Sequence, residues 1–120
     1  MHELSIAQNI IQIVNSCVEK DKLGLVEKVY LKLGLLSNVL ADSLHFSFNS
    51  IVENTPLQNS KLNIEILPIK IKCNECNEIN FTGDFIFVCP TCNSPSISII
   101  SGDEMIISSI HLKDESELVE

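Results

Sequence analysis

Four of the five cysteines in this 120-residue chain form two matching pairs. Cys73 and Cys76 make the first Cys-x-x-Cys pair, Cys89 and Cys92 make the second, and twelve residues separate the two pairs. Two such pairs can bring four thiolates to the corners of a tetrahedron, which is the geometry that Zn²⁺ adopts in structural sites. The spacing therefore predicts a zinc site at these four cysteines.

Four thiolates complete the coordination sphere of the ion, so we expect this zinc to be structural rather than catalytic. The ion would stabilise a segment of about thirty residues, which is too short to build a sufficient core of its own. Iron ligation and a redox dithiol are other uses of cysteine pairs. A redox dithiol, however, does not need a matching second pair, and zinc is the better interpretation.

A second chemical feature lies at the N-terminus, where His2 follows the α-amino group of Met1. The amine, the amide nitrogen of His2 and its imidazole can close adjacent chelate rings around one ion. Nitrogen-rich planar coordination favours Ni²⁺ or Cu²⁺ over Zn²⁺. The amine has an ordinary pKa of about 7.7 to 8.0, so a metal can compete with the proton near neutral pH. A frayed terminus without metal is the alternative interpretation.

The remaining candidate ligands are better explained as structural or surface residues. We expect His45 and His111 to be surface or core residues, and Cys17 to fill the core from the apolar face of a helix. Asp103 and Glu104 are interpreted as part of a solvated turn. The sequence contains no Ser-His-Asp order, no Walker loop and no convincing carboxylate pair, so we do not expect an enzyme.

The hydrophobic periodicity predicts the elements that must position these residues. Ser5 and Gln8 have the spacing of a capping box, which places the start of the first helix near Ser5. The expected elements are a helix from there to about residue 18, a strand over 26–33, a helix over 40–52, and strands over 61–66 and 105–112. Between the two cysteine pairs, the alternating sequence DFIFV predicts one arm of a hairpin.

Composition limits the classes of partner. The net charge of −8 repels phosphate backbones, so nucleic acid is not expected as a partner. Hydrophobic residues make up 45% of the chain and aromatic residues only 5%, which predicts a globular core of Ile, Leu and Val. The apolar runs fall short of the ~20 residues that cross a bilayer, and no secretory signal is recognisable. We therefore expect a cytoplasmic protein without a membrane span.

The chain resembles the HypA family of nickel metallochaperones over residues 1 to about 113. The resemblance rests on MHELSIA at the N-terminus, LGLLSNVL after the first strand, LHFSF in the second helix, VCPTC at the second cysteine pair, and SGDEMIISSI near the end. The most specific part is the N-terminal MHE joined to four cysteines at this distance. One departure is Asn54-Thr55 where Gly-Thr is expected, and asparagine also tolerates a left-handed backbone.

The resemblance implies an α+β fold with two lobes. Two helices would pack on a small sheet in a nickel-binding lobe formed by residues 1–68 and 103–120, and residues 69–102 would form a zinc-ribbon lobe. The last strand would return to the sheet of the first lobe. Nickel would be cargo rather than a cofactor, held by the amine of Met1 and by His2. The backbone nitrogen or the carboxylate of Glu3 would be the fourth ligand.

The resemblance also implies partners. A GTPase of the HypB type would act with the protein to deliver nickel to the large subunit of a nickel-iron hydrogenase, and some members of the family also serve urease and its maturation proteins. Two other classes are weighed against this hypothesis. A zinc-ribbon module that binds proteins or nucleic acid should carry a basic face, and a dithiol redox enzyme should expose a thiol of low pKa.

Overall fold

A computed structural model describes residues 3–113 of the chain. The elements in chain order are the helix α1 (Glu3–Cys17), the short 3₁₀ segment η1 (Lys20–Leu25), the strand β1 (Val26–Gly34), the 3₁₀ segment η2 (Leu35–Ser37), the helix α2 (Ala41–Ile51), and the strands β2 (Lys61–Leu67), β3 (Ile69–Cys73), β4 (Ile79–Thr82), β5 (Ile97–Ser101) and β6 (Met105–Leu112). The predicted α+β class is confirmed.

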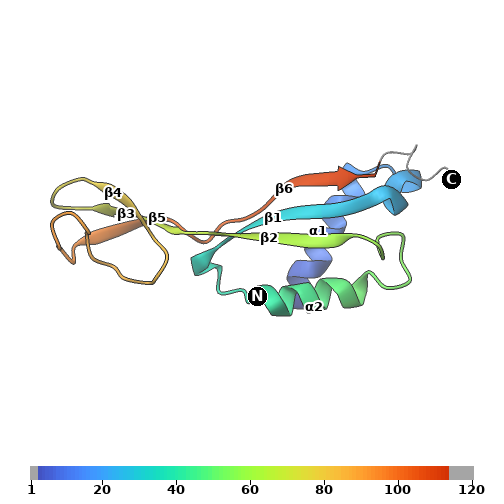
Figure 1. Ribbon diagram of the computed structural model, residues 1–120, viewed down its shortest axis with the longest axis horizontal. Helices are drawn as coiled ribbons and strands as arrows, with labels where there is room; N and C mark the ends of the chain where they lie inside the picture. The colour runs from blue at the N-terminus through green and yellow to red at the C-terminus, as the bar shows by residue number, and fades with distance from the viewer. Residues whose placement is uncertain (1–2, 114–120) are drawn as a thin grey trace. The chain divides into compact units, whose positions relative to one another are not determined.

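The described residues divide into two compact units. Unit 1 comprises residues 3–31, 39–64 and 107–113, and unit 2 comprises residues 32–38 and 65–106. The strands form two three-stranded sheets, one with the order β2-β1-β6 and one with the order β4-β3-β5 (Figure 1). The proposed assignment of nickel to one lobe and zinc to the other stays a prediction.

Unit 1 is built around an aliphatic core between its two helices and its strands. The helices α1 and α2 pack against each other, and their apolar faces share one cluster with β1 and β2. The buried members are Ile6, Ala7, Ile10, Val14, Leu23, Val26, Val29, Leu31, Leu44, Phe48, Val52, Leu57 and Leu62. The strand β6 returns beside β1, where the backbone N–H of Lys113 donates to the carbonyl of Leu25 at 2.7 Å. This pairing is the one that the family resemblance implies.

The helix α1 ends close to the predicted residue, but its start and the burial of its last residue differ from the prediction. It begins at Glu3, so Ser5 lies inside the helix and the predicted capping box at Ser5 is wrong. An acidic side chain in the first turn is favourable there, because it faces the positive end of the helix dipole. Cys17, the last residue of α1, is exposed and does not fill the core. Val18, in the turn that follows, packs against the core instead.

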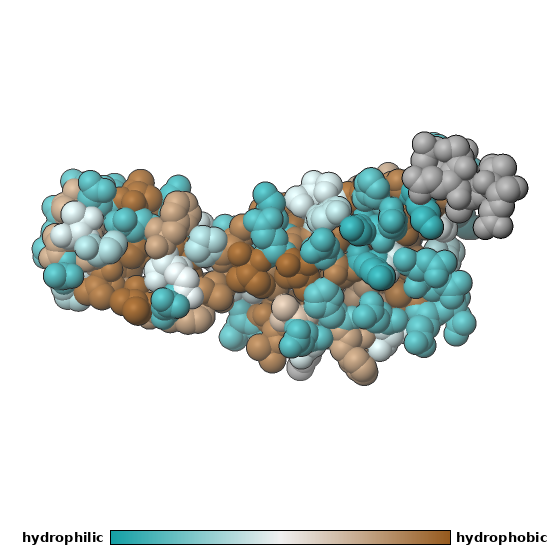
Figure 2. Space-filling model, viewed as in Figure 1, coloured by the Kyte–Doolittle hydropathy of each residue, from teal (hydrophilic) through white to brown (hydrophobic). Residues whose placement is uncertain are grey.

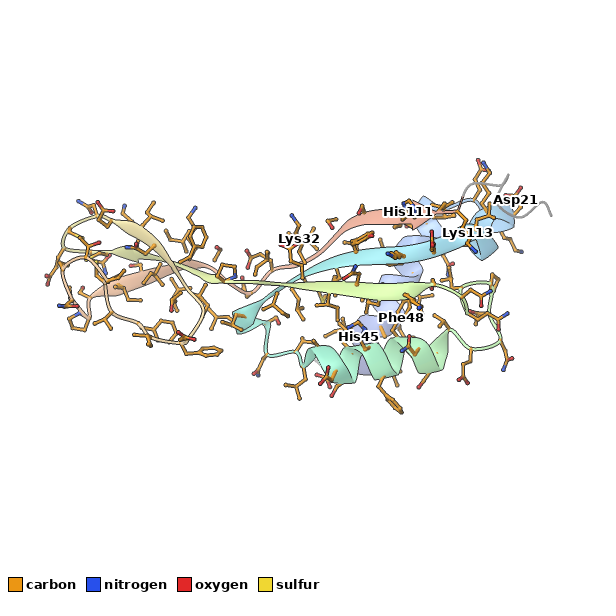
Figure 3. All side chains as sticks on the ribbon, viewed as in Figure 1. Asp21, Lys32, His45, Phe48, His111 and Lys113 are labelled. Atoms are coloured by element: carbon orange, nitrogen blue, oxygen red, sulfur yellow. The ribbon has the colours of Figure 1, made fainter. Side chains whose placement is uncertain are left out.

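The helix α2 and the strands of unit 1 lie close to the predicted ranges. Leu44 and Phe48 point from α2 into the core, and Figure 3 shows Phe48 directed towards the strands. Asn54, after the helix, adopts a φ of 61°, so the expected left-handed position is confirmed. Ile66 is 47% exposed, because β2 leaves unit 1 after Ile64. Among the described residues, no helix has both the length and the apolar character needed to cross a bilayer.

Unit 2 consists of a small antiparallel sheet and the loops that carry the cysteines. The central strand β3 pairs with β4 on one side and with β5 on the other. Ile69 and Ile71 are buried, and together with Cys73 they form the inner face of β3. The predicted hairpin arm DFIFV is wrong, because β4 ends at Thr82 and residues 84–88 form an irregular exposed loop. Alternation alone cannot create a strand where no neighbouring strand is available to pair with it.

A close backbone contact joins the start of unit 2 to its end. The N–H of Gly34 donates to the carbonyl of Glu104 at 2.7 Å, and the N–H of Leu36 donates to the carbonyl of Gly102 at 2.6 Å. A Cβ atom at Gly34 would clash with the carbonyl group of Gly102 and would lie 2.8 Å from the nitrogen of Asp103. Only glycine therefore permits this approach, although its φ of −70° suits any residue.

We predict that Gly34→Ala destabilises the protein by about 2–4 kcal/mol, because the backbone of residues 102–103 must move to admit the methyl group. Gly24→Ala is the matched control, since no atom lies within 4 Å of a Cβ placed there. Urea unfolding of the two variants provides the measurement. Equal midpoints for Gly34→Ala and wild type would show that this contact is not required.

Candidate metal centre

The two cysteine pairs are held by the same local structure. In the first, the N–H of Cys73 donates to the carbonyl of Glu78 at 2.9 Å and the N–H of Asn77 donates to the carbonyl of Cys73 at 3.1 Å. In the second, the N–H of Cys89 donates to Ser94 at 2.9 Å and that of Asn93 donates to Cys89 at 2.8 Å. Each pair thus forms a tight turn that directs both of its sulfur atoms to one side.

An asparagine closes each of these turns. Asn77 has a φ of 62° and Asn93 a φ of 61°, which is the left-handed region that asparagine tolerates better than other side chains except glycine. Both asparagines directly follow the second cysteine of their pair. The local sequence therefore specifies the turn that positions the thiols.

The structure brings the four thiols together. All four sulfur atoms lie within 4.8 Å of one another, and the Cys73–Cys92 and Cys76–Cys89 sulfur atoms are each 3.6 Å apart. A tetrahedral ion with bonds of about 2.3 Å requires about 3.8 Å between ligand sulfur atoms. A disulfide would require about 2.05 Å. The spacing fits four ligands of one metal ion, and it does not fit disulfides.

Burial places this cluster at the boundary between core and solvent. Cys73 and Cys89, the first members of the two pairs, are buried, whereas Cys76 and Cys92 are exposed. Two of the four ligand residues therefore lie at the surface of unit 2. The buried sulfur atoms connect the cluster to β3 and to the apolar interior of unit 2.

Backbone N–H groups favour the thiolate form of the first cysteine of each pair. The N–H groups of Cys76 and Glu75 each lie 3.4 Å from the sulfur of Cys73, and they lower its pKa to about 7. The N–H of Cys92 lowers the pKa of Cys89 in the same way. A thiolate is the form of cysteine that binds metal, so these contacts favour ligation.

The second cysteine of each pair behaves differently while no cation is present. The N–H of Glu78 favours the Cys76 thiolate, but partial loss of solvent around the sulfur atom and the three neighbouring thiols outweigh it and raise the pKa of Cys76 to about 12. The N–H of Ser94 likewise favours the Cys92 thiolate, but the neighbouring thiol of Cys73 helps to raise the pKa of Cys92. Four adjacent sulfur atoms cannot all be anionic without a positive charge between them. The donor set therefore fits a dication.

The predicted nickel ligands are only partly within the described residues. Met1 and His2 lie outside them, so the structure does not test the N-terminal chelate. Glu3 is the first residue of α1 and is half-buried. Its carboxylate and its backbone nitrogen both stay candidates for the fourth nickel ligand.

The other candidate ligands do not converge. Figure 3 shows His45 on α2 and His111 on β6 at separate places in unit 1. The imidazole of His111 instead lies 3.4 Å from the carboxylate of Glu27. Within residues 3–113, the four cysteines are the only group of three or more His, Cys, Asp or Glu side chains placed to hold one ion.

The interpretation of residues 103–104 as a solvated turn is wrong for Glu104. Asp103 is exposed, but one carboxylate oxygen of Glu104 is buried without a hydrogen-bond partner. The backbone contacts to Gly34 and Leu36 draw this segment into unit 2. The sequence signal for this burial is Gly102, whose φ of 148° and close contact with Ile69 require glycine.

Comparisons with known proteins identify the family. Residues 1–112 match the model of a family described as "Hydrogenase/urease nickel incorporation, metallochaperone, hypA". The chain belongs to the HypA family. This is a family of metallochaperones and maturation factors, so the protein is not an enzyme.

Two curated relatives support the assignment. A hydrogenase maturation factor HypA from Desulfatibacillum aliphaticivorans is 40% identical over 119 residues, which cover 98% of this chain and 92% of the relative. Another, from Chloroflexus aggregans, is 42% identical over 106 residues, which cover 88% of this chain and 93% of the relative. The similarity thus extends through both units.

A solved structure supports the fold. The solution structure of the nickel metallochaperone HypA from Helicobacter pylori matches with a TM-score of 0.64 at 22% identity, covering 96% of this chain and all of the other. At this identity the match concerns the fold alone.

We predict that Cys73→Ser removes the metal that the purified protein holds, because three thiolates cannot complete a tetrahedral site. Unit 2 should lose protection against amide hydrogen exchange, whereas the helices of unit 1 should keep it. Cys17→Ser is the matched control, since Cys17 is exposed on α1 and outside the cluster. Elemental analysis should find about one ion per chain in wild type and control. A full ion in Cys73→Ser would overturn the ligand assignment.

Proposed function

We propose that this protein is a nickel carrier that binds Ni²⁺ through its N-terminal residues and delivers it for the maturation of a nickel-iron hydrogenase. The observation that carries the proposal is the family match over residues 1–112, which includes a histidine at the second position. Nickel is the cargo in this function. The four-cysteine cluster has a separate, structural role.

The chemistry of the cluster supports zinc as its resident ion. Cys73, Cys76, Cys89 and Cys92 would hold it, and four sulfur ligands leave no coordination position for cargo or water. Zinc accepts tetrahedral sulfur coordination without a preference from its filled d shell. Bound there, it would link β3, the first turn and the second turn of unit 2.

The chemistry of the N-terminus supports nickel as the cargo. The amine of Met1, the amide of His2 and its imidazole supply three nitrogen donors, and Glu3 can supply a fourth ligand through its backbone nitrogen or its carboxylate. This set favours planar coordination, which zinc does not prefer. The two ions are therefore directed to different sites by ligand type and geometry.

The family description supports partners in hydrogenase maturation. We infer that a GTPase of the HypB type and the large subunit of the hydrogenase are two of them, and that proteins of urease maturation are a further candidate group. The cytoplasm is the proposed location. A nucleic-acid-binding module is disfavoured by the net charge of −8.

We predict that His2→Ala and acetylation of Met1 each weaken nickel binding at least about tenfold, because each removes one donor of the same chelate. Acetylation is preferable to an added residue, since an extension moves His2 to third place and builds another nickel-binding motif. Zinc content and thermal stability should stay at the wild-type values. Nickel titration by isothermal calorimetry provides the measurement.

The matched controls are His45→Ala and His111→Ala, which remove the other two histidines of the chain. Both should bind nickel with wild-type affinity. Wild-type affinity in either of the two N-terminal variants would refute the proposed chelate, and loss of affinity in a control would move the site to that histidine.

A further inference from the structure

The small sheet of unit 2 presents an outer face that combines apolar and basic side chains. Lys70 pairs with Phe81 on β4, and Lys72 pairs with Ile79. Directly paired residues of antiparallel strands project from the same face of a sheet. On β5 the corresponding partners are Ser101 and Ser98. We call the six residues Lys70, Lys72, Ile79, Phe81, Ser98 and Ser101 the Lys–Phe face.

The Lys–Phe face is turned to solvent. Phe81 is 65% exposed and Ile79 is 49% exposed, whereas Ile69 and Ile71, which alternate with the lysines along β3, are buried. The ammonium group of Lys70 lies 5.9 Å from the centre of the Phe81 ring, a contact that keeps the charge beside the aromatic surface. The sheet thus buries one face and leaves an apolar and basic one uncovered.

This face carries no carboxylate, although Asp and Glu outnumber Lys and Arg by sixteen to eight in the whole chain. Glu78 and Asp84 lie just before and just after β4 and are the nearest acidic residues along that strand. The two lysines are also the only basic residues between positions 65 and 106. A positive, apolar face on an acidic protein is a specific feature rather than an average surface.

The apolar surface continues beyond β4. Phe85 and Ile86 are both more than half exposed, and Phe87 and Val88 are also exposed. Three of the six aromatic residues of the chain, Phe81, Phe85 and Phe87, therefore lie within seven residues and outside the core. A hollow of about 190 Å³ brings Phe81 together with Ile86, Val88 and Pro90 of the following loop, and it reaches Ile71 and Thr82 on the inner face of the sheet. Figure 2 shows apolar side chains at the surface over β3–β5.

Contiguous exposed apolar surface of this kind marks an interaction site in soluble proteins. We propose that the Lys–Phe face binds the client protein that receives nickel. The client would contact it with a patch of apolar side chains bordered by carboxylates. The apolar side chains would cover Phe81 and Ile79, and the carboxylates would face Lys70 and Lys72. The proposal rests on the proposed function, because delivery of nickel requires contact with the protein that receives it.

Charge favours this occupant over a second copy of the chain. A two-fold dimer through this face would place the lysines of one copy against the same lysines of the other, and like charges in an interface oppose association. Nucleic acid is disfavoured as the occupant, because the two lysines lie on a protein whose net charge of −8 repels phosphate groups. A partner surface with acidic and apolar side chains would complement both the lysines and the apolar side chains of the Lys–Phe face.

The test measures binding of the metal-loaded, full-length protein to the purified precursor of the hydrogenase large subunit. Phe81→Thr removes the aromatic ring and keeps a residue that suits a strand. Lys70→Glu combined with Lys72→Glu reverses the charge. We expect each variant to weaken the Kd at least about tenfold, and the charge reversal to flatten the dependence of the Kd on salt. Nickel affinity and metal content should not change.

Matched controls lie in unit 1. Phe46 is 74% exposed on α2, so Phe46→Gln removes an equally accessible ring from another surface. Lys20→Glu combined with Lys22→Glu reverses two lysines of η1. Both controls should bind the precursor within about twofold of wild type, because neither touches the docking face. If Phe81→Thr loses its metal, Lys72→Glu alone carries the test, since Lys72 is exposed on β3.

The outcomes separate the docking proposal from the proposed function. Wild-type affinity in both face variants, with nickel bound normally, overturns the docking face and leaves the nickel carrier intact. Failure of the wild-type protein to bind nickel overturns the carrier itself. Loss of binding to the GTPase but not to the precursor overturns the choice of occupant. So does a wild-type dimer, seen by sedimentation, that the face variants dissociate.

Discussion

The fold of unit 2 depends on the cluster of four thiols, because this unit has very little apolar core. Its buried apolar side chains are few, chiefly Leu33, Ile69 and Ile71, whereas unit 1 buries thirteen in one cluster. The two buried cysteines are themselves part of that small interior. A segment of this size normally needs a metal or disulfides to be stable. The sulfur spacing of 3.6 Å fits a metal, and binding of an ion there would be coupled to the folding of unit 2.

The same coupling connects the cluster to the outer surface of the sheet. Cys73 is the last residue of β3 and directly follows Lys72, and β4 begins three residues after Cys76. The turn between them is closed by the hydrogen bond from Cys73 to Glu78. Ligation of both cysteines would therefore stabilise the register that places Phe81 beside Lys70. An ion held by the four cysteines would in this way also support the proposed docking face.

The sequence predicted the parts of the fold whose signals are local. The strands at 26–33 and 105–112 and the helix at 40–52 were found because their apolar residues repeat with a clear period over a sufficient length. The strand β3 was missed although IKIKC alternates, because five residues are a weak signal beside the cysteines. The strand β5 was missed because a bulge opposite Lys70 and Ile71 interrupts its alternation.

The candidate site shows the same limit. The spacing of the cysteines was enough to predict that the four thiols converge, since each turn fixes two of them. The Lys–Phe face could not be predicted in this way, because it depends on pairing between strands that are separate in the sequence. The burial of the Glu104 carboxylate likewise depends on its contact with Gly34, seventy residues earlier. Features of this kind require the register of the chain in three dimensions.

The two proposed metal sites of the protein avoid competition through their ligands. A tetrahedral cluster of four sulfur ligands does not supply the planar coordination that Ni²⁺ favours. The proposed nitrogen-rich chelate at the N-terminus does not supply the tetrahedral coordination that Zn²⁺ favours. Without a metal ion, the thiols of the cluster differ in pKa. The pKa of Cys73 is lowered to about 7 and that of Cys76 is raised to about 12. Binding of a dication there would therefore release protons from the thiols of the cluster. The proposed N-terminal chelate uses none of these four thiols, so loss of its cargo would leave the ligands of the cluster in place.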